Sequence, residues 1–262
     1  MANLFNLILY RPLFNALIYL YHIIPGHDLG IAIIVLTVLI KLLLFAPSYS
    51  SIKATSSMQA LQPKLDAIKK QYKDNREEQG RQLMKLYKEH RVNPLSSCLP
   101  LLVQLPIIWA LYRVFYAGIK LDPSTGFLTA DQLQHLYGWL RDLYSHTQIN
   151  TIFLGFVDLA KNKNFVLAFL SAVATFWQSK MLMPKRQPKI PGAKDENLMA
   201  STSRQMTYFF PLIVFYFGMV FPAGLTLYWF ASTLFQIAQQ YYFLRRQKPK
   251  PAPNENLQSP IK

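Results

Sequence analysis

The chain has 262 residues, of which 52% are hydrophobic and 16% are charged, and its formal net charge is +15. Soluble domains carry about 25% charged residues, so this composition argues against a soluble protein and favours a polytopic membrane protein. The single cysteine, Cys98, excludes an intramolecular disulfide and a cysteine metal cluster, and we expect it to be a small apolar side chain.

The N-terminal segment, 1–28, contains an apolar run that Arg11, Pro12 and Asn15 interrupt. No small-residue cleavage site follows and no cysteine is present there, so we expect neither a secretory signal peptide nor a lipoprotein anchor. We expect a helix from Pro12 to Ile24 that lies in the membrane interface. A sixth membrane span is the alternative.

Five later segments have the apolar character of membrane spans, which need about 20 such residues. They are 29–49, 95–119, 165–183, 206–221 and 222–244. The turn before Gly224 is so tight that the last two must be antiparallel neighbours. The sequence therefore predicts an all-α polytopic membrane protein with five transmembrane helices. The connecting segments are a cytoplasmic hairpin (50–94), an extracytoplasmic loop (120–164), a cytoplasmic loop (184–205) and a basic tail (245–262).

The basic residues are distributed unequally between the two sides of the predicted spans. Segments 50–94, 184–205 and 245–262 hold 20 lysines and arginines, whereas the other side holds five. The positive-inside rule then places the N-terminus outside and the C-terminus in the cytoplasm. The positive net charge thus mainly reflects membrane topology. It is therefore weaker support for a nucleic-acid-binding function.

The segment 50–94 has the periodicity of two helices joined by a polar turn at Asp74-Asn75. Either residue of the turn can cap the second helix. Apolar residues recur at steps of three and four on both sides of the turn, which predicts an antiparallel helical hairpin. The stripes are Met58, Leu61, Leu65, Ile68 and Tyr72, then Leu83, Leu86 and Tyr87. The basic outer face is a candidate for recruiting anionic lipid or ribosomal RNA, and a simply solvated face is the alternative. The candidate recruiting residues are Lys64, Lys69, Lys70, Arg81 and Lys85.

Lys41 lies inside the first predicted span, where a cation costs about 2.5–3.5 kcal/mol at the centre of the bilayer. The predicted spans contain no Asp or Glu, so an ion pair with a neighbouring span is not available. We therefore expect a water-filled cavity around Lys41. The other candidate residues inside the spans are Thr37, Gln104, Gln178, Tyr228 and Trp229. Each has a simpler interpretation, since glutamines join helices and aromatic rings pack in cores.

Catalytic signatures are missing from the sequence. It contains no HExxH, Gly-rich phosphate loop or GxSxG motif, and its five histidines do not cluster. We expect no enzymatic activity, no catalytic residue, no metal and no cofactor. Proton relays and ion-coupled transport usually need carboxylates or histidines within the membrane, and the predicted spans have none.

Several stretches resemble the YidC/Oxa/Alb family of membrane protein insertases. They are PLFNALIYLYHII, GIAIIVLTVLIKLLLFAPSYSS, MQALQPKLDAIKKQY, LYKEHRVNPLSSCLPLLVQLPIIWALYRVF and FFPLIVFYFGMVFPAGLTLYWFASTLFQIAQQYYF. The resemblance covers most of the range 11–246. It implies a five-helix core with a hydrated, positively charged groove that opens to the cytoplasm and the lipid and is closed to the outside. We expect a short bacterial form without the large extracytoplasmic domain of many relatives.

The resemblance also implies roles for individual residues. Lys41 occupies the position where the family usually has arginine, and lysine keeps the charge but not the forked donor geometry. The implied groove residues are Lys41, Thr37, Gln104, Gln178, Tyr228 and Trp229. The implied substrate path along the second span contains Cys98, Pro100 and Tyr112.

The implied function is the insertion and folding of nascent membrane proteins in the bacterial inner membrane. The implied partners are those nascent proteins, anionic lipids, the Sec translocon, the ribosome and the signal recognition particle receptor. Two alternatives remain at this stage. One is a small solute transporter or channel, and the other is a scaffold or assembly chaperone that acts beside a translocon.

Overall fold

The computed structural model describes residues 2–90, 92–93, 99–118, 126–181, 183 and 198–246. Most of these residues are helical, in agreement with the predicted fold class. The N-terminal helices are α1 (Ala2–Phe5), the π-helix η1 (Asn6–Tyr10), α2 (Arg11–Ile23), α3 (Leu29–Leu43), α4 (Phe45–Gln71) and α5 (Arg76–Glu89). After them come α6 (Leu99–Tyr112), the π-helix η3 (Arg113–Gly118), α7 (Ala130–Leu133), α8 (Gly138–Tyr144), α9 (Phe165–Met181), α10 (Leu198–Val220) and α11 (Ala223–Arg246).

Length and hydropathy do not by themselves identify the membrane spans. Among the described residues, no single helix is both long enough and apolar enough to cross a bilayer alone. The pair α3 and α4 meets both criteria together, although the two helices are bent by 68°. Two further segments, Phe165–Met181 and Thr207–Val220, are apolar but shorter. The number of spans therefore stays a prediction.

The first predicted span, 29–49, is broken at Leu44, where α3 ends and α4 begins. Proline explains the position of this break. Pro47 has no amide hydrogen to donate to the carbonyl of Leu43, and its ring would clash with that carbonyl in a continuous helix. Pro47 is tolerated in the first turn of α4, where amides have no partner inside the helix. The chain therefore turns here and α4 leaves in a new direction.

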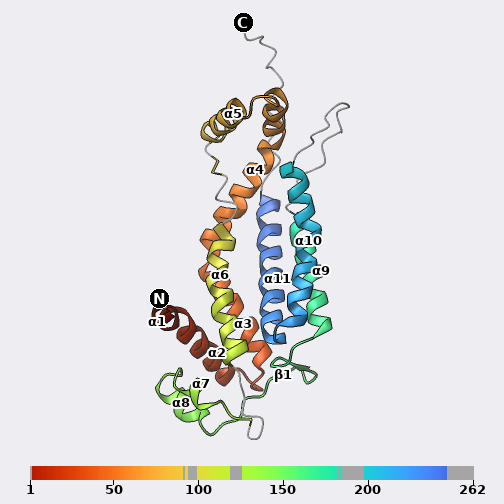
Figure 1. Cartoon of the computed structure of the whole chain (residues 1–262). Coiled ribbons are helices and arrows are strands. Elements are labelled where there is room, and N and C mark those ends of the chain that lie inside the picture. The colour runs from red at the N-terminus through yellow and green to blue at the C-terminus, as the bar shows by residue number, and fades with distance from the viewer. Residues whose placement is uncertain are drawn as a thin grey trace.

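The helical hairpin consists of α4 and α5 and lies at one end of the molecule (Figure 1). Pro63 lies inside α4 without ending it. Asn75 caps α5 by accepting a hydrogen bond from the amide of Glu78 at 3.0 Å. The predicted stripes meet in a small core, in which Leu61, Leu65 and Leu86 are buried and Met58, Ile68, Leu83, Tyr87 and Val92 pack around them. The hairpin thus has an apolar core of its own.

In the helical bundle, α9 packs extensively against both α10 and α11, and α11 packs against α3. Helices α10 and α11 lie side by side after the turn at Pro222 (Figure 1). Small residues allow α9 and α10 to approach closely, since a Cβ added to Gly218 of α10 would lie 2.9 Å from the Cβ of Ala168 of α9. Such small-residue contacts are typical of helix pairs in membranes.

A compact loop region covers the opposite end of the bundle from the hairpin (Figure 1). It contains α7, α8 and an antiparallel pair of two-residue strands, β1 (Ile152–Phe153) and β2 (Val157–Asp158). The all-α prediction did not include these strands, because two residues are too few to show an alternating pattern. Asp28 connects this region to the bundle. Its carboxylate caps α3 through the amides of Gly30 and Ile31 and also accepts from the amide of Leu154 at 3.1 Å.

The N-terminal helices α1, η1 and α2 follow one another without a break and run obliquely beside the bundle (Figure 1). Helix α2 packs against α3 and buries Phe14, Leu17 and Ile18. The main apolar core extends from these residues through α3, α6 and α11 to the loop region. The N-terminal segment is therefore part of the core packing.

Candidate functional site

Lys41 lies at the centre of a polar bridge between three helices. Its ammonium donates a hydrogen bond to Oε1 of Gln104 at 2.9 Å. The amide nitrogen of Gln104 donates in turn to the hydroxyl of Tyr228. Because these residues lie on α3, α6 and α11, a single glutamine side chain connects all three helices. The structure thus brings together three of the predicted groove residues.

The ends of this bridge are deeply buried. Lys41 is 6% exposed and Tyr228 is 2% exposed, whereas Gln104 between them is only partly buried. A buried ammonium without a partner would carry a large desolvation cost, which the Gln104 carbonyl partly offsets. The sequence suggested water as the partner of Lys41 in the absence of a carboxylate, and the structure supplies an amide oxygen. The hydration of this site remains a prediction.

Thr37 lies one turn before Lys41 and is 1% exposed. Its hydroxyl donates to the carbonyl of Ile33 at 2.6 Å. This contact within α3 satisfies the hydroxyl donor in apolar surroundings, as buried threonines in helices often do. Thr37 therefore shares a helix with Lys41 and has a hydrogen bond of its own.

Gln178 and Trp229 make separate contacts among α9, α10 and α11. Gln178 donates to the side chain of Gln236, which joins α9 to α11. The ring of Trp229 packs 6.4 Å from that of Phe210, between centroids, and lines a small cavity with Ser171 and Thr226. These two predicted groove residues therefore have their described contacts away from the Lys41 bridge.

The predicted substrate path along the second span is partly described. The ring of Tyr112 lies 5.7 Å from that of Trp109 and 5.4 Å from that of Phe221. Phe221 stacks in turn on Phe217 at 5.3 Å, so an aromatic row connects α6 with the end of α10. Cys98 lies outside the described residues. Pro100 lies in α6, and its side chain is not among those described.

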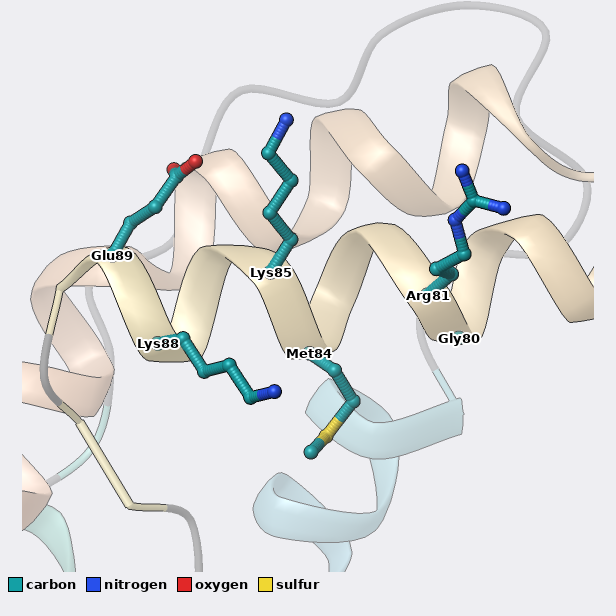
Figure 2. Close-up of a pocket in the computed structure, with 6 residues that line it drawn as sticks. All are labelled: Gly80, Arg81, Met84, Lys85, Lys88 and Glu89. Atoms are coloured by element: carbon teal, nitrogen blue, oxygen red, sulfur yellow. The ribbon is translucent and has the colours of Figure 1, made fainter.

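The basic hairpin residues have unequal surroundings. Lys64 is exposed and contacts Nε2 of His90 at 3.2 Å, and Lys70 is also exposed, whereas Lys69 is partly buried. Arg81 makes an exposed ion pair with Glu78 at 3.6 Å, and such a pair contributes little to stability. Figure 2 shows the side chains along α5, where Arg81 and Lys85 line an open surface pocket with Gly80, Met84, Lys88 and Glu89.

Arg113 is a further cation inside a predicted span, and the sequence did not single it out. Arg113, at the end of the second predicted span, donates to the side-chain oxygen of Asn6 and lies 5.2 Å from the centre of the Tyr10 ring. This interaction holds the N-terminal helices beside η3. The signal in the sequence that could have revealed Arg113 is a charged residue within an apolar run. Its contact with Asn6 could not be foreseen, because more than 100 residues separate Arg113 from Asn6 in the chain.

The chemistry of the Lys41 bridge is that of binding. An ammonium, an amide and a phenol can hold a carboxylate or a polar peptide, and together they offer no nucleophile paired with a base. Within the described ranges, no group of three or more histidines, cysteines or carboxylates is arranged to hold a metal ion. The site is therefore suited to attracting a polar or acidic segment.

A buried cation among apolar helices, with a basic helical hairpin at one end of the bundle, is typical of a polytopic membrane protein. The family model described as 60Kd inner membrane protein matches residues 19–250, and the chain belongs to this family. The resemblance recognised in the sequence is thereby confirmed.

Two curated relatives illustrate the similarity. The chain is 32% identical over 240 residues to a membrane protein insertase YidC of Rickettsia rickettsii (strain Sheila Smith), covering 90% of this chain and 38% of that protein. It is also 32% identical over 235 residues to a membrane protein insertase YidC of Geobacter sulfurreducens, covering 90% of this chain and 37% of that protein. The chain thus spans about two fifths of the length of these relatives.

Proposed function

We propose that this protein inserts nascent membrane proteins into the bacterial inner membrane and assists their folding. Membership of the 60Kd inner membrane protein family supports this proposal, as do relatives named membrane protein insertase. The structural observation that carries it is the buried ammonium of Lys41, which contacts an uncharged amide and has no fixed counter-ion among the described residues. Such a cation can pair with the carboxylate of an acidic substrate that reaches it.

The proposed topology has five spans, which are α3, α6 with η3, α9, the apolar part of α10, and α11. The N-terminal helices lie at the outer interface, and the extracytoplasmic loop contains α7 and α8. The basic hairpin and the tail lie in the cytoplasm, which is the side favoured for lysine and arginine. The positions of the hairpin and the loop region at opposite ends of the molecule support this arrangement (Figure 1).

The proposed mechanism begins with a nascent chain that has a short acidic or polar tail before a hydrophobic segment. The hydrophobic segment moves along the second, third and fifth spans while the tail enters a hydrated groove. Lys41 attracts the negative charge of the tail, and water in the groove shortens the apolar distance that the tail must cross. The closed loop region at the outer end retains the tail until insertion proceeds.

Transfer of the hydrophobic segment into lipid supplies the driving force. Burial of apolar surface is favourable by about 25 cal/mol per Å², so a membrane segment needs no nucleotide to leave the groove. Loss of the substrate helix from the groove then restores the contact between Lys41 and Gln104. This scheme requires no covalent chemistry, in line with the expectation that the protein is not an enzyme.

The proposed partners are nascent membrane proteins first of all. The basic hairpin, with Lys64, Lys70, Arg81 and Lys85 exposed, is suited to anionic lipid headgroups. The Sec translocon, the ribosome and the signal recognition particle receptor are further proposed partners. A role as an assembly chaperone beside a translocon is compatible with independent insertion. The small solute transporter or channel is no longer supported, because the curated relatives are named insertases.

The test is insertion of a single-span substrate into liposomes that contain the purified protein alone. Substrates with acidic, neutral and basic tails are compared in the wild type and in Lys41→Arg, Lys41→Ala and Lys41→Glu. We expect Lys41→Arg to preserve insertion, and Lys41→Ala and Lys41→Glu to impair insertion of the acidic-tailed substrate. Normal insertion of that substrate by Lys41→Glu would contradict the electrostatic role.

A separate test addresses recruitment by the hairpin. Liposomes with and without anionic lipid are supplied with the wild type and with a variant that lacks residues 57–90. We expect the deletion to reduce substrate capture while the remaining helices stay folded by circular dichroism. Unchanged insertion by a folded deletion variant would show that the hairpin does not recruit substrate.

A further inference from the structure

Gln104 occupies an unusual position in the described site. Its carbonyl oxygen accepts from Lys41 at 2.9 Å, and its amide nitrogen donates to Tyr228. Both ends of its amide are therefore engaged, each by a residue that is almost fully buried. Gln104 itself is only partly buried, so it is the member of the bridge that an entering segment meets first. In this arrangement the ammonium of Lys41 is covered.

The position of Gln104 within α6 separates it from the part of the helix that is packed most tightly. Ile107, Ala110 and Leu111 are buried in the bundle, whereas Leu105 is 51% exposed. Pro106 lies between Gln104 and this buried part. A proline inside a helix removes one backbone hydrogen bond and allows a kink. The turn of α6 that carries Gln104 is thus joined to the buried half of this helix through Pro106, where the backbone lacks one hydrogen bond.

The contact between Lys41 and Gln104 is also one that a substrate can replace. The hydrogen bond from Lys41 to Gln104 already has an ionised donor, but a carboxylate adds the attraction between two full charges, which an amide oxygen lacks. A substrate carboxylate near Lys41 therefore competes successfully with the carbonyl of Gln104.

We propose that Gln104 is a latch that closes the Lys41 site at rest and is displaced by the carboxylate of an acidic substrate tail. Opening moves the turn of α6 that precedes Pro106 away from α3 and α11. Gln104 is a positioning residue in this scheme, and it makes the site selective for acidic tails. A neutral tail cannot displace it as effectively. The inference rests on the proposed insertase function and adds a substrate-controlled gate to it.

The latch can be tested through a contact that does not depend on insertion. A carbodiimide joins a carboxylate directly to a neighbouring amine, and mass spectrometry locates the product. A hydrophobic peptide with an acidic tail is added to proteoliposomes and is expected to couple to Lys41. A peptide with an amidated tail is not expected to couple, and Lys41→Arg removes the reactive amine.

Two substitutions of Gln104 separate a latch from ordinary helix contacts. Gln104→Glu supplies an internal carboxylate, so we expect about tenfold less coupling of the peptide to Lys41 and about tenfold less insertion of the acidic-tailed substrate. Thermal stability should be equal or higher. Gln104→Met keeps the volume but not the hydrogen bonds, so we expect faster coupling and a lower unfolding midpoint. Gln205→Glu, at an exposed glutamine of α10, is the matched control.

The outcomes distinguish the latch from the proposed function. Wild-type coupling and insertion by Gln104→Glu would overturn the latch, as would insertion by the wild type without any coupling to Lys41. Coupling to Lys41 that is suppressed by Gln104→Glu, in a protein that inserts no substrate, would support the latch and contradict the insertase function.

Discussion

The hydroxyl of Ser48 donates a hydrogen bond to Oε1 of Gln239 at 2.7 Å, which ties the first turns of α4 to α11. The amide of Gln239 also donates to the carbonyl of Phe45 at 3.4 Å. Gln239 is 5% exposed, and the neighbouring ring of Tyr49 lies 5.2 Å from that of Phe243. One side chain on the last helix thus holds the bend that directs the hairpin away from the bundle.

Gln239→Leu is expected to loosen this bend. The substitution removes the acceptor of the Ser48 hydroxyl and the side-chain donor to the Phe45 carbonyl, at a cost of about 1–2 kcal/mol. We expect faster hydrogen–deuterium exchange in residues 45–52 and little change in α9. The control is Gln205→Leu, the same substitution at an exposed site. Equal exchange in both variants would show that Gln239 does not hold the bend.

Asn15→Ala is expected to destabilise the contact between α2 and the loop region. The Asn15 amide donates to the carbonyl of His135 at 2.9 Å, and its carbonyl accepts from the amide of Tyr137 at 2.7 Å. Asn15 is 4% exposed, and its loss leaves the amide of Tyr137 without this acceptor and the carbonyl of His135 with only the longer bond from Arg11 at 3.4 Å. We expect a loss of about 1–3 kcal/mol, measured by unfolding in detergent.

The matched control for that measurement is Gln134→Ala, which removes an exposed hydrogen bond to Asp131 in the same loop. We expect this variant to unfold within about 0.5 kcal/mol of the wild type, as surface substitutions usually do. A similar loss in both variants would argue that Asn15 has no special role.

Gly30→Ala is expected to displace the β1–β2 pair from the end of α3. An added Cβ would lie 2.1 Å from a ring carbon of Phe153, which is closer than any real contact. Faster proteolysis of the loop at 145–164 would report the displacement. Gly80→Ala is the control, because nothing lies within 4 Å of its added Cβ. There we expect a gain of about 0.5–1 kcal/mol in the hairpin, since alanine favours the helix.

Asp158 is expected to make the loop region sensitive to acid. Burial by itself raises the pKa of this carboxyl, but hydrogen bonds from Thr151, Lys161 and the amide of Ala160 lower the pKa below its usual range. A lowered folded-state pKa means that the unfolded chain binds more protons in acid. The stabilisation is therefore complete above the unfolded pKa of about 3.9 and is lost as the pH falls through the folded pKa.

The measurement is the unfolding midpoint of the wild type and of Asp158→Asn between about pH 7 and pH 2.5, a range that covers the titration of an aspartate. We expect the wild type to be more stable at neutral pH and the difference to shrink below about pH 4. A difference that is constant with pH would exclude titration of Asp158 as its cause.

The helices of this protein could be recognised largely from the sequence, because their signals are local. The apolar stripes of 50–94 predicted both helices of the hairpin and the residues that meet between them. Helix ends were less certain, as the break at Leu44 shows. Pro47 was visible in the sequence, but a proline near a helix end is compatible with either a kink or a new first turn.

The candidate site was predictable only in part. A lysine in an apolar run identified Lys41, since its burial needs compensation. The same reasoning gave Gln104 and Tyr228 as polar residues inside spans, but not their contact with each other. It also grouped Trp229 with them, although Trp229 and Tyr228 are adjacent in α11 and therefore point in different directions.

The sequence by itself determined the family, the mostly helical fold and the presence of a cation that cannot be neutralised by a carboxylate in its own helix. These follow from composition, periodicity and motifs, which need no knowledge of distant contacts. The tertiary structure decided that one glutamine joins Lys41 to Tyr228, that Arg113 holds the N-terminal helices, and that Gln239 fixes the bend at α4. Each depends on residues far apart in the chain, whose proximity is set by the packing of whole helices.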